Sequence, residues 1–174
     1  MAQLPNDIHT YLAWQFDAVL PGVFRRNKAD YAHIEFPILA PLPTRKASTP
    51  PLEGAAAQGP FIYFVVDQSS EVQYVGKSKE KTVIKRWVRP GVGGPGTHYW
   101  THTNTSAGCV RRIAEGIQLG HGPFRLRFVG VHSVPPVYAS RFAAQYSHLD
   151  ALERAEKGFM SLLRPKWNDP KSYK

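Results

Sequence analysis

The sequence predicts an α+β fold, a small antiparallel three-stranded sheet flanked by helices and preceded by an N-terminal helical arm. Residues 61–66 and 71–76 are two apolar stretches separated by turn residues, which is the pattern of a β-hairpin. Residues 124–129 alternate apolar side chains with arginines, as in a strand with one exposed face. Helical apolar spacing occurs between and after these strands. The order strand, strand, helix, helix, strand, helix is typical of α+β domains.

The first 58 residues are predicted to form the helical arm and a proline-rich linker. Over residues 8–20 the apolar side chains have helical spacing, and Pro21 and Gly22 end the run. Residues 37–60 contain six of the 15 prolines of the chain, which favours an extended connection. The main domain is then expected to span residues 59–174.

Three helices are predicted within this main domain. The first covers residues 79–89 and the second covers residues 106–120, both with apolar residues at helical spacing. The third spans residues 147–163 and begins with a capping-box pattern made by Ser147 and Asp150.

The composition favours an anionic partner. Lys and Arg total 22 against 13 acidic residues, which gives a net charge of +9 and a pI near 9.8. Such a charge attracts nucleic acid first and an anionic membrane surface second, although it would also serve solubility alone. The single cysteine, Cys109, excludes an internal disulfide. No apolar run is long enough to span a bilayer, and no secretory signal is visible. We therefore expect a cytoplasmic protein.

An acidic residue interrupts the apolar face of the last predicted helix. One apolar arc of this helix contains Leu149, Leu152, Phe159, Met160 and Leu163, and Glu156 lies near the middle of that arc. A carboxylate that faces a core costs several kcal/mol unless it is paired. It would therefore form a buried ion pair with an arginine, or line a cleft where it holds a hard cation.

With the hairpin and this helix in place, the chain resembles the GIY-YIG nuclease family over residues 59–168. The carboxylate followed by a Pro-x-aromatic-Asn ending looks like the repair and restriction members. The residues that carry the resemblance occur in the order of the family motifs: Phe61-Ile62-Tyr63, Tyr74-Val75-Gly76, Lys77, Arg86, Glu156 and Asn168.

The chain departs from the family pattern at a few positions. Phe61 replaces the first glycine of the first motif, which leaves the tyrosine untouched. Arg86 lies slightly farther from the second motif than usual. Pro90 occupies the position, one helical turn later, where many members have His or Tyr. His98 or Tyr99 could replace that side chain from a different backbone position.

The resemblance implies a metal-dependent endonuclease that hydrolyses phosphodiester bonds of double-stranded DNA. A restriction-type or defence nuclease is expected, with a repair or homing-type nuclease as the alternative. Glu156 would bind one divalent cation, Mg²⁺ or Mn²⁺, which tolerates one carboxylate together with water and substrate oxygens. Arg86 would hold a phosphate oxygen and stabilise the transition state.

The resemblance also implies roles for the remaining motif residues. Tyr63 would be the general base, and Tyr74 would bind the water or the phosphate. Lys77 would help to ionise Tyr63, and Asn168 would brace the backbone near the site. Without the resemblance, both tyrosines would be ordinary strand aromatics and Lys77 an exposed turn residue.

DNA contacts are predicted for a further set of basic residues: Lys79, Arg89, His98, His102, Arg125 and Arg127. His98 and His102 have helical zinc spacing, but two histidines do not make a closed metal site. A homodimer on DNA is plausible because two strands must be cut, and no membrane partner is expected. The rival interpretation is a non-catalytic nucleic-acid-binding module, which would have no need of an inward-facing Glu156.

Overall fold

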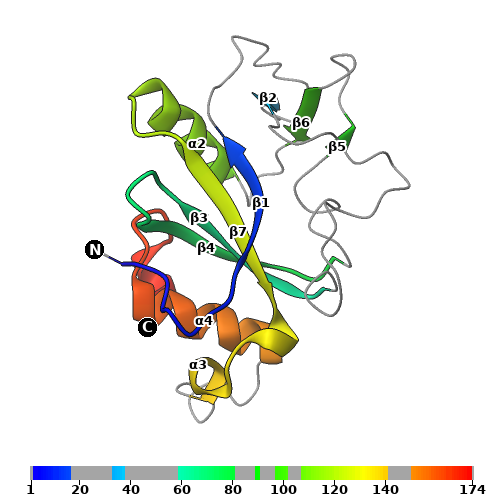
Figure 1. The fold of residues 1–174 in the computed structure, drawn as a ribbon, viewed down its shortest axis with the longest axis vertical. Helices are drawn as coiled ribbons and strands as arrows, with labels where there is room; N and C mark the ends of the chain where they lie inside the picture. The colour runs from blue at the N-terminus through cyan, green and yellow to red at the C-terminus, as the bar shows by residue number, and fades with distance from the viewer. Residues whose placement is uncertain are drawn as a thin grey trace.

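A computed structural model describes residues 2–16, 33–37, 59–80, 89–90, 97–101, 107–140 and 150–173 (Figure 1). The strands are β1 (Tyr11–Phe16), β2 (His33–Pro37), β3 (Phe61–Val66), β4 (Val72–Ser78), β5 (Arg89–Pro90), β6 (Thr97–Thr101) and β7 (Phe124–Gly130). The helices are α2 (Ala107–Gln118), α3 (Pro136–Ser140) and α4 (Ala151–Leu163), with 3-10 turns η2 at Val131–Ser133 and η3 at Pro170–Tyr173. None of the helices in these ranges has the length and apolarity that a bilayer crossing requires.

The main sheet is antiparallel and has the strand order β1-β7-β3-β4. The predicted α+β class is confirmed at this level. All six residues of β3 are buried, as expected for an apolar strand between two neighbours. β4 and β7 confirm the predicted hairpin partner and the predicted alternating strand. β4 is last in the strand order and is therefore an edge strand of the sheet. Side chains on its two faces and the groups along its open edge all lie close to one another.

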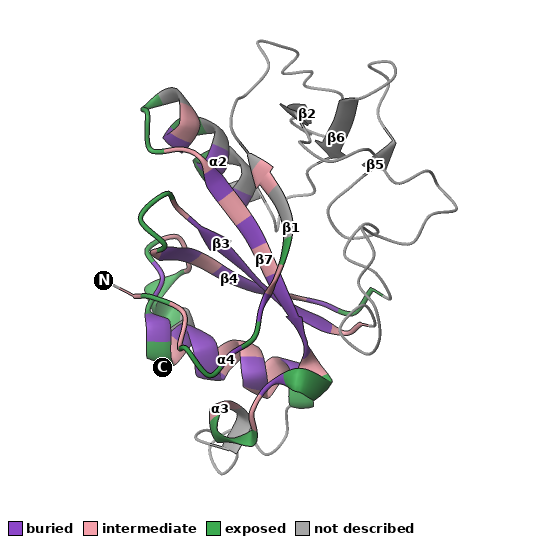
Figure 2. Cartoon of the chain, viewed as in Figure 1, coloured by how far each residue is buried: buried purple, intermediate pink, exposed green. Residues whose placement is uncertain are grey.

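Helices cover both faces of this sheet (Figure 2). On one face, Ile62 and Phe64 of β3 pack with the buried side of α4, where the rings of Phe64 and Phe159 meet edge to face at 5.1 Å. On the opposite face, α2 approaches so closely that a Cβ added to Gly116 would meet the ring of Phe124. Successive strand residues point to opposite faces, so β4 supplies side chains to both layers.

The predicted N-terminal helix over residues 8–20 is wrong where the chain is described, because Tyr11–Phe16 forms β1. This strand pairs antiparallel with β7, so the main sheet has four strands and not three. The helical spacing of the apolar residues was outweighed by pairing with β7. The Arg127 side chain of β7 also donates to the hydroxyl of Thr10, just before β1, at 2.7 Å and to its carbonyl at 3.0 Å. β1 lies within residues 1–58, the range predicted as a separate arm.

A second, three-stranded sheet has the order β2-β6-β5. It corrects the predicted helix over residues 79–89 at its ends, since Lys79 is not helical and Arg89 begins β5. Residues 81–88, and residues 38–58 of the predicted linker, lie outside the described part of the chain. The helix predicted over residues 106–120 is confirmed as α2.

The last helix is present as predicted, but its N-cap is Asp150 and not Ser147, which lies outside the described residues. The Asp150 carboxylate accepts a hydrogen bond from the backbone N–H of Glu153 at 2.8 Å. This N–H and the nearby Lys79 lower the pKa of Asp150. A lowered pKa means that the cap stabilises the fold at neutral pH and that this contribution is lost as the pH falls below about 4.

We expect Asp150→Ala to lower the free energy of unfolding by about 1 kcal/mol, because α4 loses a side-chain acceptor at its N-terminus. Asp150→Ser keeps an acceptor and should retain most of that stability. Urea unfolding of the two variants beside the wild type measures the difference. Equal destabilisation by both changes would contradict the capping role.

Candidate active site

Lys77 and Glu156 lie on the face of the sheet that α4 covers. The Lys77 Nζ atom is 2.9 Å from Glu156 Oε2 and 3.3 Å from Glu153 Oε1. The Glu156 side chain is 15% exposed and the Lys77 side chain 31%. Of the two interpretations of Glu156, the ion pair is therefore present, with a lysine in place of the arginine that the sequence suggested.

Tyr63 and Tyr74 lie on the opposite face of the same two strands. Tyr63 stands opposite Gly76 in the β3–β4 pairing, and its ring covers this glycine. Its side chain is hydrogen-bonded to Tyr74, and the two ring centroids are 6.1 Å apart. Tyr63 is buried, whereas Tyr74 is partly exposed. The two motif tyrosines therefore form one pair of phenols.

The outer border of β4 is bound by the chain that follows α4. Asn168 donates through Nδ2 to the carbonyl of Val75 at 2.8 Å and accepts the Val75 N–H at 2.9 Å. The neighbouring Trp167 N–H donates to the Gln73 carbonyl at 2.9 Å. These bonds satisfy edge groups that an unpaired strand would leave open. The backbone contact expected for Asn168 is present, and it fixes β4 between the tyrosine pair and the Lys77–Glu156 pair.

The electrostatics of this site keep two of its groups protonated. Burial raises the pKa of Tyr74, and the charges of Tyr63, Cys109 and Glu156 and the hydrogen bond to Tyr63 raise it further. Partial burial lowers the pKa of Lys77, but the hydrogen bond and the charge of Glu156 outweigh this and leave it raised. Tyr74 is thus a neutral phenol and Lys77 an ammonium at neutral pH, and both are hydrogen-bond donors. Glu156 acts on Tyr74 electrostatically although the two residues belong to different faces.

Gly76 leaves no room for a side chain beside the ring of Tyr63. A Cβ at Gly76 would lie 2.5 Å from the ring carbon Cζ and the hydroxyl oxygen of Tyr63. We expect Gly76→Ala to lower the free energy of unfolding by about 1–3 kcal/mol and to displace the Tyr63 hydroxyl. The cost should shrink in a Tyr63→Leu background, where the ring is absent. Denaturant unfolding of the four chains of this double-mutant cycle measures the coupling, and a coupling of zero would contradict the packing argument.

The other predicted residues are placed as follows. Arg86 and His102 lie outside the described residues, while Arg89 is in β5 and His98 is in β6, a strand instead of the helix that zinc spacing would need. Lys79 pairs with Asp150 at 3.2 Å on the surface.

Arg125 and Arg127 do not project freely from an open sheet face, as the alternating pattern suggested. Both are half-buried, and Arg125 donates to the Gln15 side chain of β1 at 3.1 Å. Partial burial, and then the charge of Arg125, lower the pKa of Arg127. The addition of β1 next to β7 accounts for this difference, since Gln15 of β1 and Thr10 just before it supply acceptors to the two guanidinium groups. Their DNA contacts stay a prediction.

Glu153 is a site residue that the sequence analysis missed. It shares Lys77 with Glu156 and lies three residues before it on α4. Residues three apart on a helix are neighbours on its surface, so this spacing was the signal that could have found it.

Comparison with known proteins adds nothing to this geometry, because no family model, no curated protein and no solved structure matches the chain. What the site does must be inferred from its residues and their positions.

Proposed function

We propose that this protein is a metal-dependent endonuclease of the GIY-YIG type that hydrolyses double-stranded DNA, as a restriction or defence nuclease. One observation carries the proposal. Five residues of the motif pattern, which come from β3, β4, α4 and the segment after α4, converge on one edge strand: Tyr63, Tyr74, Lys77, Glu156 and Asn168. Core packing alone does not require two phenols, an ammonium and a carboxylate around a single strand.

The donors of the site suit Mg²⁺. Among the described residues, no group of three or more His, Cys, Asp or Glu side chains could hold a metal ion. The resemblance makes Glu156 the single protein ligand, with water and phosphate oxygens in the other positions, a coordination that Mg²⁺ tolerates. A bound cation would stabilise charge on the scissile phosphate and on the leaving oxygen. The Lys77 ammonium, 2.9 Å from this carboxylate, would have to move aside or share the carboxylate when the cation binds.

Tyr63 would accept the proton of the attacking water, and Tyr74 would assist it. Because the pKa of Tyr74 is raised, Tyr74 keeps its proton and can donate a hydrogen bond to an ionised Tyr63. A hydrogen bond to the charged form favours that form. In this proposal Tyr63 is the base and Tyr74 is the hydrogen-bond donor that stabilises its ionised form. Arg86 keeps the role of phosphate ligand that the resemblance assigns to it.

Incubation with supercoiled plasmid tests the proposal. We expect the wild-type protein to give nicked and linear products with Mg²⁺ and none with EDTA. The Glu156→Gln variant is prepared in parallel, so that a contaminating nuclease would be detected as cleavage by both preparations. Cleavage that is equal in the two preparations, or absent with both Mg²⁺ and Mn²⁺, would overturn the proposal.

The second candidate is a non-catalytic nucleic-acid-binding module. The Lys77–Glu156 ion pair favours it, because each charge satisfies the other without a metal ion. Such a module would shift the plasmid on a gel and leave it supercoiled under every metal condition.

A further inference from the structure

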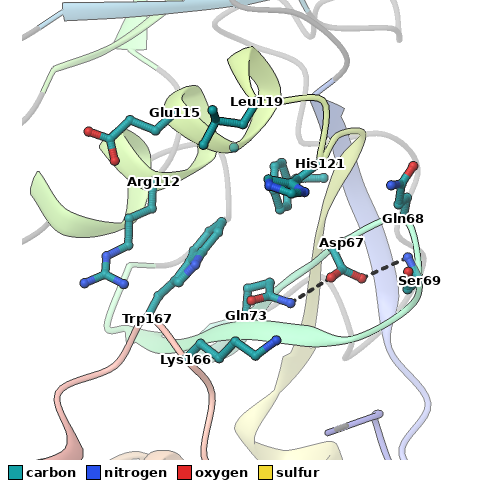
Figure 3. Close-up of a pocket in the computed structure, with 12 residues that line it drawn as sticks. Asp67, Gln68, Ser69, Gln73, Arg112, Glu115, Leu119, His121, Lys166 and Trp167 are labelled. Atoms are coloured by element: carbon teal, nitrogen blue, oxygen red, sulfur yellow. Dashed lines mark hydrogen bonds between the residues drawn. The ribbon is translucent and has the colours of Figure 1, made fainter.

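A cavity of about 710 Å³ lies beside the candidate active site, between the β3–β4 turn, the second half of α2 and the segment after α4 (Figure 3). Its volume is within the range of ligand sites, roughly 300–1,000 Å³. The lining residues that matter here are Asp67, Gln73, Arg112, His121 and Trp167. They come from three separate elements, so the cavity exists only in the folded chain.

Two acidic side chains, Asp67 and Glu115, line this cavity, and Asp67 is held by hydrogen bonds within the fold. Asp67 Oδ1 accepts the backbone N–H groups of Ser69 and Glu71, both at 2.9 Å. Its other oxygen accepts from Gln73 Nε2 at 2.7 Å. The carboxylate therefore organises the turn and orients the Gln73 amide.

Of the lysine and the arginine that line the cavity, Lys166 pairs with Glu71 at 3.1 Å, whereas Arg112 is not held in this way. Arg112 is exposed on α2, and no residue in the described ranges forms an ion pair with it. Its guanidinium therefore offers charged donors in a fork geometry that matches phosphate oxygens.

Trp167 supplies a fixed aromatic surface in the same cavity. Its backbone N–H is held by the Gln73 carbonyl, and its ring packs on Phe124 with the centroids 5.2 Å apart. Figure 3 shows Arg112 extending from α2 beside the indole, with the Gln73 amide below it. A held aromatic ring and a charged donor within one cavity are the two groups that bind a nucleotide, through its base and its phosphate.

The cavity also adjoins the proposed active site. Gln73 and Trp167 are the chain neighbours of Tyr74 and Asn168. On α2, Cys109 lies close enough to Tyr74 to act on it electrostatically, and Arg112 follows three residues later on the same side of the helix. A DNA strand bound at the tyrosine pair would therefore have a neighbouring nucleotide close to this cavity.

We propose that the cavity binds one unpaired nucleotide, with its base against Trp167 and its phosphate against Arg112. The nucleotide must leave the duplex stack to enter, since the cavity can hold a single nucleotide but not a paired duplex step. This rests on the proposed function in that the nucleotide belongs to the DNA substrate. It goes beyond that function because it predicts a preference for DNA with an extrahelical base.

Fluorescence anisotropy in EDTA tests the proposal without cleavage. The probes are a labelled duplex with one unpaired adenosine in the middle and the same duplex fully paired. We expect wild-type protein to bind the bulged duplex roughly tenfold more tightly, the size of effect that stacking of one base provides. Arg112→Gln and Trp167→Leu should each reduce this preference to within about twofold of unity.

Two variants serve as matched controls. Lys171→Gln removes the same unit charge at an exposed position outside the cavity, and Trp167→Phe keeps an aromatic ring. Both should retain the preference. Because Arg112 is exposed, its variant should fold normally even if Trp167→Leu does not, and thermal unfolding checks each variant.

The absence of a preference in the wild type, or a preference that survives Arg112→Gln, would overturn the cavity proposal. Plasmid cleavage without the preference for the bulged duplex would overturn the cavity proposal alone and leave the nuclease proposal intact. A preference for the bulged duplex in a protein that never cuts would overturn the nuclease proposal and leave nucleotide binding in the cavity intact. A protein that neither binds nor cuts DNA would overturn both.

Discussion

Glu156→Gln should abolish plasmid cleavage, with a loss of at least about a thousandfold, while DNA binding persists. The change removes the negative charge that would hold the metal ion, whose stabilisation of the transition state is worth several kcal/mol, and each 1.4 kcal/mol is a factor of ten in rate. The amide has nearly the same shape, and Lys77 keeps Glu153 as a partner at 3.3 Å, so the fold should survive. Removal of a carboxylate near phosphates should leave affinity equal or higher.

Glu153→Gln is the matched control for this experiment. It makes the same chemical change on the same helix and beside the same lysine, but at a side chain that is 29% exposed where Glu156 is 15% exposed. We expect this variant to keep most of the activity. Single-turnover cleavage with saturating Mg²⁺, together with a binding titration in EDTA, measures both effects. Robust Mg²⁺-dependent cutting by the Glu156→Gln variant would show that the metal ligand lies elsewhere.

Tyr63→Phe should slow the chemical step by about 10²–10⁴-fold, which is the usual contribution of general acid–base catalysis. The ring packs over Gly76 and is retained in Phe, so stability should change little. In the wild type the rate should climb with pH as Tyr63 ionises. In the Tyr63→Phe variant that climb should disappear. A variant that cuts within a few-fold of wild type, with the same pH profile, would make Tyr63 a core aromatic and place the base elsewhere.

Tyr74→Phe separates the two phenols in the same experiment. Burial raises the pKa of Tyr74, so Tyr74 cannot be the base near neutral pH. Its loss should remove a donor from Tyr63 and move the rise of the pH–rate profile to higher pH. The profile should be recorded below pH 10. A raised pKa means that the folded state binds this proton more tightly than the unfolded chain, so stability falls as the pH rises above about 10.

Local sequence patterns were sufficient to predict the strands and the helix that carry the motif residues. β3, β4 and α4 lie where apolar runs and helical periodicity predicted them, because burial on one or both faces leaves a strong imprint on composition. The same periodicity failed over residues 8–20. There the apolar spacing is compatible with a helix, and hydrogen bonding to β7, more than one hundred residues away, decides for a strand. No local signal reports such a partner.

For the candidate site, the sequence by itself determined which side chains are candidates for chemistry, namely the two tyrosines, Lys77 and the carboxylate of Glu156 within an apolar helix face. Only the tertiary structure decided that Lys77 and Glu156 form a pair at 2.9 Å, that the two tyrosines hydrogen-bond, and that Asn168 binds Val75. The physical reason is the sheet topology. β4 lies at the edge of the sheet, so α4, the tyrosine pair and the chain after α4 all reach it from different sides. Val75 and Asn168, which are 93 positions apart along the chain, meet there.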